Sequence, residues 1–285
     1  MENYDEFFQD YKKNQNKSEG DSILELVRLK EHIGHVYGSD TICIFLYSIV
    51  KRERPLSIVE LGTGLGVSTL WMARALRENG VGHIYTVDDG RDSYKLKEYI
   101  KDFAFKNKDI YIEEDSDCDN KFYYMYLEQL IKKYDVEEHV SICRQTLDLH
   151  TSVPLNPENY PFLSQSIDLL FSDIDHGPET ILDVLAQFLP YMAEYSSIFI
   201  DSASTHLPSY LTLECIINDL NRGKVPQRFL AFECPQTRFN LMQLVLQRRF
   251  RLIHLTEKVK RYQNSTAWIV IEPNEYTPNP NVSLH

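Results

Sequence analysis

Hydrophobic residues follow two different spacings along this chain, and the change between the spacings predicts its elements. Short runs rich in β-branched residues predict strands, the first at Ser57–Leu61 and the second at His83–Val87. Between them, Val67–Glu78 carries apolar residues at helical spacing. A strand, a glycine-rich turn, a helix and a second strand form a βαβ unit, whose strands are parallel.

The alternation continues along the chain and then changes. Further strands are predicted at His139–Cys143, Ile167–Ser172 and Ser197–Ile200, and further helices at Tyr94–Phe105, Phe122–Tyr134 and Glu179–Met192. Phe250–Leu255 and Thr266–Ile271 are two strands with no room for a helix between them, so they should pair as an antiparallel hairpin. The pattern predicts an α/β fold, a doubly wound, mostly parallel, seven-stranded Rossmann-like sheet with a terminal antiparallel hairpin.

The N-terminal part is predicted to be helical. Ser22 and Glu25 have the spacing of a capping box, and Gly38–Thr41 opens another helix, which Pro55 ends. We expect three parts: a helical cap at 1–54, the main domain at 55–272 and a tail at 273–285. The cap should cover the substrate side of the domain or form a homodimer contact.

Composition and charge narrow the class of protein. The chain has 285 residues, with 42 Asp and Glu against 30 Lys and Arg, so its formal charge is −12. This charge argues against nucleic acid as a partner, because phosphate binding needs a positive field. The cysteines form no C-x-x-C pair, the N-terminus lacks the apolar run of a signal peptide, and Thr41–Val50 is too short to span a bilayer. We therefore expect a cytoplasmic protein without a membrane segment.

A glycine-rich loop, Gly62-Thr63-Gly64-Leu65-Gly66, joins the first strand to its helix. Ligands of such sheets bind at the carboxyl ends of the strands. Val67 stands where the dinucleotide pattern G-x-G-x-x-G needs its third glycine, and no Gly-Lys-Ser or Gly-Lys-Thr of a P-loop follows. Asp88, after the second strand, can accept hydrogen bonds from both hydroxyls of a ribose. Glu60 lies where a ligand ammonium could be held, which favours a cationic ligand with an amino-acid moiety.

The run VELGTGLG, with an acid after the second strand, resembles the class I S-adenosylmethionine (SAM)-dependent methyltransferases. The resemblance covers about residues 39–272, and the terminal hairpin agrees with it. It implies that the loop lines the methionine end of SAM, that Asp88 binds the ribose, and that residues after the third strand lie on the adenine side. The residues on the methionine end are Glu60, Gly62, Thr63, Gly64 and Gly66, and those on the adenine side are Gln145 and Thr146.

Acidic residues also follow the fourth and fifth strands. Asp173 and Asp201 should converge at the sheet edge, and carboxylates suit Mg²⁺. The layout resembles the catechol-type and bacterial natural-product O-methyltransferases, which implies a divalent metal on Asp173 and Asp201. It also implies that His176, three positions beyond Asp173, is a general base. Ser202 replaces the expected Asn or Asp, so Asp175 is an alternative ligand.

Other roles stay open for the residues after these two strands. His176 or Asp173 could instead cap the following helix, and Asp175 could orient His176. His206 could line the acceptor pocket or lie in an exposed loop. The aromatic run Phe122–Tyr126 is more typical of helix packing than of an acceptor pocket.

The sequence thus predicts a SAM-dependent methyltransferase whose acceptor is a hydroxyl of a small molecule such as a natural product or secondary metabolite. The methyl group would pass directly to the acceptor, with His176 or Asp173 taking the proton. One alternative is an NAD-dependent Rossmann oxidoreductase. Another is a methyltransferase-like subunit that binds a partner without catalysis.

Overall fold

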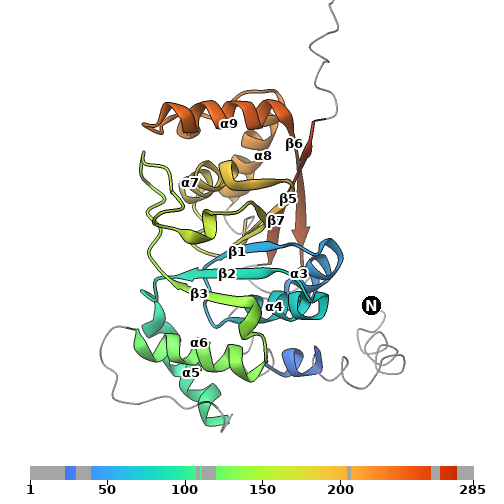
Figure 1. The fold of residues 1–285 in the computed structure, drawn as a ribbon, viewed down its shortest axis with the longest axis vertical. Helices are drawn as coiled ribbons and strands as arrows, with labels where there is room; N and C mark the ends of the chain where they lie inside the picture. Colours follow the sequence, from blue (N-terminus) through green and yellow to red (C-terminus); the bar gives the residue numbers. More distant parts are fainter. Residues whose placement is uncertain are drawn as a thin grey trace, which may run out of the picture.

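The computed structural model describes residues 23–29, 40–106, 110, 120–203, 207–257 and 264–274. They form a seven-stranded sheet of order β3-β2-β1-β4-β5-β7-β6 (Figure 1). The strands are β1 Ser57–Leu61, β2 His83–Asp88, β3 Val140–Arg144, β4 Ile167–Ser172, β5 Met192–Asp201, β6 Arg248–Thr256 and β7 Ser265–Pro273. β1 to β5 are parallel, whereas β7 pairs antiparallel with β5 and β6. The predicted fold class and terminal hairpin are confirmed.

Helices cover both faces of this sheet. They are α3 Asp40–Glu53, α4 Val67–Asn79, α5 Ser93–Lys106, α6 Lys121–Lys133, α7 Pro178–Phe188, α8 Leu207–Asn221 and α9 Pro235–Gln247. Figure 1 shows α7, α8 and α9 in the upper part of the view and α3 to α6 in the lower part. Neighbouring residues of β1 point into opposite cores: Ile58 packs with α3, α4 and α6, and Val59 packs with α7 and α8. β1 is therefore buried on both faces, as its continuous apolar run predicts.

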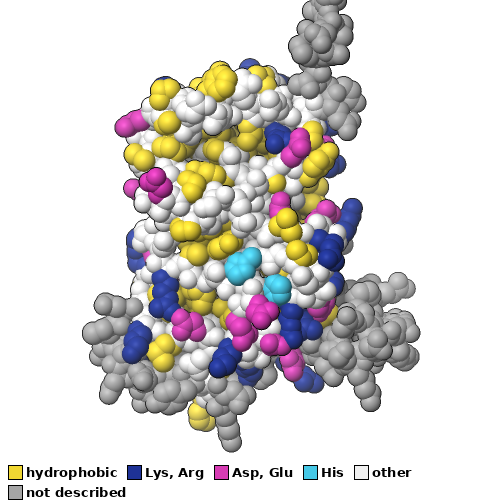
Figure 2. Space-filling model, viewed as in Figure 1, with side chains coloured by type: hydrophobic (Ala, Val, Ile, Leu, Met, Phe, Trp, Pro, Cys, Tyr) yellow, Lys and Arg dark blue, Asp and Glu magenta, His cyan; other side chains and the backbone are white. Residues whose placement is uncertain are grey.

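Two helices and part of a strand were not predicted. Residues 207–247 received no element from the sequence, yet they hold α8 and α9, and β5 begins at Met192 rather than Ser197. Apolar residues of α9 lie on both its faces, since Leu241 is buried whereas Phe239 and Met242 are about half exposed. Figure 2 shows hydrophobic side chains at the surface over this upper part of the molecule. Helical periodicity is therefore blurred in this region.

Part of the predicted domain scheme lies outside the described residues. Of the expected cap at 1–54, the structure describes residues 23–29, which are helical, and 40–54. Cys43 and Leu46 of α3 share a core with α4 and the sheet. The tail beyond residue 274 lies outside the described residues. None of the helices in the described ranges is long and apolar enough to cross a membrane.

Candidate active site

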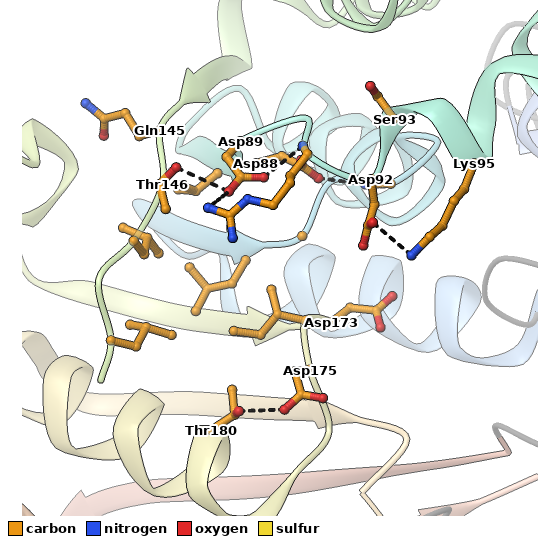
Figure 3. Close-up of a pocket in the computed structure, with 18 of the residues that line it drawn as sticks. Asp88, Asp89, Asp92, Ser93, Lys95, Gln145, Thr146, Asp173, Asp175 and Thr180 are labelled. Atoms are coloured by element: carbon orange, nitrogen blue, oxygen red, sulfur yellow. Dashed lines mark hydrogen bonds and ion pairs between the residues drawn. The ribbon is translucent and has the colours of Figure 1, made fainter. Parts of the chain in front are cut away.

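A cavity of about 840 Å³ opens at the carboxyl ends of the central strands. Predicted site residues from distant parts of the sequence share its wall: Gly62, Gly64, Asp88, Gln145, Thr146, Asp173 and His176. Figure 3 shows Asp88 and Asp89 on one wall and Asp173 and Asp175 across from them. Glu60, Thr63, Gly66 and Asp201 are not part of the wall.

The glycine loop is tied to the ends of its neighbouring strands. Gly62 N donates to Val87 O at 2.9 Å, and Asp173 N donates to Leu61 O at 2.8 Å. Gly62 has a φ of +89°, and a Cβ built there would lie 2.3 Å from the carbonyl oxygen of Asp173. Only glycine permits this approach, which brings the loop against the start of the Asp173–His176 segment.

Asp88 holds the loop from the other side. Its Oδ2 accepts hydrogen bonds from Thr63 N at 3.0 Å and from Gly64 N at 3.4 Å. Its Oδ1 accepts from Gly90 N at 2.7 Å. The carboxylate is therefore fixed at the cavity wall by backbone donors, beside the loop that precedes α4.

Tyrosine hydroxyls of α6 also hold the loop. Tyr123 Oη lies 2.9 Å from Gly64 O and 3.1 Å from Asp88 Oδ2. Tyr124 Oη donates to Asp88 O at 2.9 Å, and Tyr126 Oη donates to Leu65 O at 3.1 Å. Burial raises the pKa of Tyr123 far above its usual range, so its hydroxyl stays a donor. The aromatic run is helix packing, as expected, but its polar ends also position the predicted ligand loop.

Glu60 lies behind the loop rather than at the cavity. The side chain is fully buried, and Ser68 Oγ and Thr69 Oγ1 of α4 each donate to it at 2.5 Å. Burial raises its pKa from 4.5 to about 7. In this structure the carboxyl group joins β1 to α4, and its contact with a ligand ammonium stays a prediction.

Asp175 stabilises the turn that leads into α7, whose N-cap residue is Gly177. Its Oδ2 accepts from Thr180 Oγ1 at 2.7 Å and from Gly177 N at 3.3 Å, and the Thr180 bond lowers its pKa. Asp175 thus fixes the start of α7 (Figure 3). The carbonyl oxygen of His176 accepts from Ser209 Oγ at 2.5 Å, which ties the same segment to α8.

Asp201 is engaged away from the cavity wall. Its Oδ1 accepts from Thr266 Oγ1 at 3.0 Å and its Oδ2 from Ser202 Oγ at 2.8 Å. Within the described ranges, no group of three or more His, Cys, Asp or Glu side chains could hold a metal ion. Binding of Mg²⁺ by Asp173 and Asp201 stays a prediction. The described residues place no third His, Cys, Asp or Glu side chain with them as a ligand. His206 lies outside the described residues.

A profile of a methyltransferase domain family matches residues 59–203, about half of the 285-residue chain. The match includes the glycine loop, Asp88 and Asp173. The chain belongs to this family. The resemblance to the class I SAM-dependent methyltransferases is thereby confirmed, and the match does not favour the NAD-dependent or non-catalytic alternatives.

Solved structures share the methyltransferase fold. An O-methyltransferase from Bacillus cereus in complex with S-adenosylhomocysteine (SAH) is 15% identical, covers 94% of this chain and 96% of its own, and has a TM-score of 0.51. The O-methyltransferase TomG from Streptomyces achromogenes, involved in tomaymycin synthesis and in complex with SAM, is 12% identical, covers 91% of both chains and has a TM-score of 0.47. No curated protein sequence matches this chain. At these identities the comparison with the Bacillus cereus enzyme supports the fold.

The wall of this methyltransferase cavity is acidic. Five aspartates line it with one arginine and one lysine: Asp88, Asp89, Asp92, Asp173, Asp175, Arg91 and Lys95. Arg91 pairs with Asp89 at 3.1 Å, and Lys95 pairs with Asp92 at 2.8 Å. The remaining carboxylates give the site a negative field, which favours a cationic ligand.

His150 is one of the residues of the cavity wall that the sequence analysis did not name. It follows β3, and its Nδ1 contacts Oδ2 of Asp183 on α7. No motif marks either residue, because they lie 33 positions apart and meet only in the fold.

Proposed function

We propose that this protein transfers a methyl group from SAM to a hydroxyl oxygen of a small molecule. The observation that carries the proposal is the shared cavity. It joins Gly64 and Asp88, expected at the cofactor, to Asp173 and His176, expected at the acceptor. A volume of about 840 Å³ lies in the range of small-molecule sites. The Bacillus cereus neighbour is an O-methyltransferase, which supports oxygen as the acceptor atom.

The residues present fit SAM. Gln145 Oε1 is buried and has no hydrogen-bond partner within the described part of the chain, although Gln145 belongs to the cavity wall. A buried acceptor without a donor is costly, so a ligand donor at this position would be favourable. Gly62 has no side chain, so the loop presents backbone atoms to the cavity at this position. The acidic wall suits the positive charge of the sulfonium.

Residue roles follow from this arrangement. SAM, when bound, supplies an electrophilic methyl group on its sulfonium. Asp88 would bind the ribose, and Gln145 and Thr146 would lie at the adenine. His176 would accept the proton of the acceptor hydroxyl, and Asp173 would orient that hydroxyl or replace His176 as base. The cavity itself would align the oxygen with the methyl group, which lowers the entropic part of the barrier.

Binding and turnover can be tested separately. Calorimetry with SAM and SAH tests the cofactor, and transfer of labelled methyl to matched phenol, alcohol and amine acceptors tests the reaction. We expect SAM and SAH binding, and label on hydroxylated acceptors only. A protein that binds neither ligand would refute the cofactor assignment, and label on amines alone would refute O-methylation.

A further inference from the structure

Helix α9 lies at the upper end of the molecule in Figure 1 and carries apolar side chains on two faces. Leu241 and Val245 are buried in the core that α9 shares with α7 and α8. On the outer face, Phe239, Met242 and Leu246 are 55%, 48% and 51% exposed. The core of the described chain thus uses one apolar face of this helix, and the other face is open.

The three exposed residues, Phe239, Met242 and Leu246, form what we call the α9 seam. They are three and four positions apart, which is the a/d spacing at which one helix packs against another. At about 100° per residue, their side chains leave the helix within an arc of about 60°. A stripe this narrow matches the contact face of a single helix, so the seam fits a second helix.

Uncharged polar residues flank the α9 seam. Four amide side chains lie on one side of it: Gln236, Asn240, Gln243 and Gln247. Arg238 is the only charged residue among the 13 of α9, whereas a chain with 25% charged residues would give a surface helix of this length about three. Amides both donate and accept hydrogen bonds, so they can face an identical surface without repulsion.

The charge of the chain favours an identical partner at this helix. The formal charge is −12, so two copies repel each other wherever their acidic surfaces approach. α9 contains no Asp or Glu, so two copies can meet there with apolar and amide groups in contact. A basic partner protein would find no carboxylate on this helix to bind.

The spacing of the α9 seam is also self-complementary. Two copies related by a two-fold axis present the same stripe to each other. Met242 lies close to the midpoint between Phe239 and Leu246 in the sequence. In an antiparallel pair with the axis beside Met242, Phe239 of one copy therefore faces Leu246 of the other, and the two Met242 side chains meet.

We propose that a second copy of this chain docks on α9, with the two α9 helices antiparallel and packed through the α9 seam. The paired stretch is about 20 Å long and buries less than the roughly 1,600 Å² of a standard interface, so we expect a dissociation constant of order micromolar. No residue of α9 lines the methyltransferase cavity, so the proposal does not depend on the proposed function. The contact also differs from the one expected at the cap, whose α3 lies in the lower part of Figure 1.

Sedimentation equilibrium of the full chain tests the dimer. Met242→Glu would place two like charges face to face and should raise the dissociation constant by roughly 10²-fold. The melting temperature of the monomer should not fall, because Met242 is half exposed. Phe105→Glu is the matched control, since Phe105 is an 87% exposed apolar residue on α5 in the lower part of Figure 1.

Mixtures of variants test the antiparallel register. Phe239→Glu and Leu246→Lys should each weaken self-association, and their mixture should form a heterodimer roughly 10-fold tighter than either homodimer, because the two charges face each other. A mixture of Phe239→Glu with Phe239→Lys should not recover. In the antiparallel pair the two copies of residue 239 lie about 10 Å apart along the helix axis.

Each result either supports or overturns the proposal. A wild type that stays monomeric at concentrations on the order of 100 µM would overturn it. The chain beyond Asn274 would then be the candidate to cover the α9 seam, because Asn274 N donates to Gln247 O at 2.8 Å at the end of α9. A dimer that is unchanged in Met242→Glu would also overturn it and would direct the search to the cap. Recovery in the mixture of the two Phe239 variants would overturn the antiparallel arrangement.

Discussion

The hydroxyl oxygen of Tyr123 lies 3.1 Å from Oδ2 of Asp88 and 2.9 Å from the carbonyl oxygen of Gly64. One hydroxyl hydrogen can serve only one of these acceptors at a time. Tyr123 can therefore donate to Gly64 when ribose hydroxyls donate to Asp88. The relationship joins α6, which lies between β2 and β3 in the chain, to both halves of the predicted cofactor site.

Tyr123→Phe should weaken SAM binding by roughly 3- to 10-fold, because one hydrogen bond that fixes Asp88 and the loop is lost. The ring stays, so the melting temperature should fall little. Calorimetry and thermal unfolding measure the two effects. Tyr195→Phe is the matched control, because Tyr195 is 70% exposed and is not part of the cavity wall. Equal SAM affinity in both variants would contradict the positioning role.

Asp88→Ala should weaken SAM binding by roughly 10- to 100-fold, because charge-assisted bonds to the ribose are lost. The backbone donors of Thr63 and Gly90 also lose their acceptor, so the loop itself should loosen. Calorimetry measures the affinity. Asp102→Ala, in an exposed ion pair on α5, provides the comparison. Unchanged affinity in Asp88→Ala would remove the assignment of the ribose to this residue.

Because Glu60 is buried, we expect the folded protein to lose stability as the pH rises. Its pKa in the folded protein is about 7, above the ordinary value of 4.5. The folded protein therefore binds this proton more tightly than the unfolded chain. The contribution of this bound proton to the free energy of unfolding is complete below about pH 4.5 and is lost as the pH rises through about 7.

Glu60→Gln resembles the protonated acid and should not lose stability in this range. The free energy of unfolding of wild type relative to Glu60→Gln should fall by up to about 3 kcal/mol between pH 5 and about pH 8. Urea unfolding of both proteins at the two pH values measures the difference. A constant difference would mean that Glu60 is ionised throughout the range.

The sequence predicted the parts of the fold that depend on local pattern. The β-branched runs located β1 and β4 at their observed bounds, and the short spacing of β6 and β7 required a hairpin. α8 and α9 were not predicted because apolar residues such as Leu211 and Phe239 are exposed, which blurs the helical periodicity. Tertiary packing, not local pattern, determines these helices.

Some residues of the candidate site could also be predicted from local pattern, and others could not. Asp88 and Asp173 could be expected at the cavity because each ends a parallel strand, and such ends meet at one edge of the sheet. Tyr123 and His150 could not be expected. Their partners Gly64 and Asp183 lie 59 and 33 positions away in the chain, and only the packing of α6 and α7 brings them together.

Asp173 allows a direct test of the metal prediction. Asp173→Asn should reduce turnover with the fold intact, because the residue lies where cofactor and acceptor should meet. If Mg²⁺ binds there, excess chelator should abolish wild-type activity, and added Mg²⁺ should restore it. Full activity in excess chelator would exclude the metal, and the role of Asp173 would then be to orient the acceptor.

His176 is the predicted base, and its pH profile tests the role. The rate of wild type should fall in acid with an apparent pKa of about 6–7 as the imidazole protonates. His176→Ala should flatten this limb and lower turnover by roughly 10²- to 10⁴-fold, the usual contribution of a general base. SAM affinity should change little, because the ribose and adenine contacts are assigned to other residues. Steady-state rates across pH, with calorimetry for SAM, measure both.

The structure also bears on the alternative role of His176, which is to cap the start of α7. If His176 capped α7, His176→Ala would lower the melting temperature and leave the turnover unchanged. However, Thr180 Oγ1 and Gly177 N already have Asp175 as their acceptor. We therefore expect Asp175→Ala to lower the melting temperature more than His176→Ala. His254→Ala, on β6 and outside the cavity wall, controls for removal of an imidazole. An acidic limb that persists in His176→Ala would assign the base to Asp173, Asp175, His206 or His150, and the double variant with each would identify it.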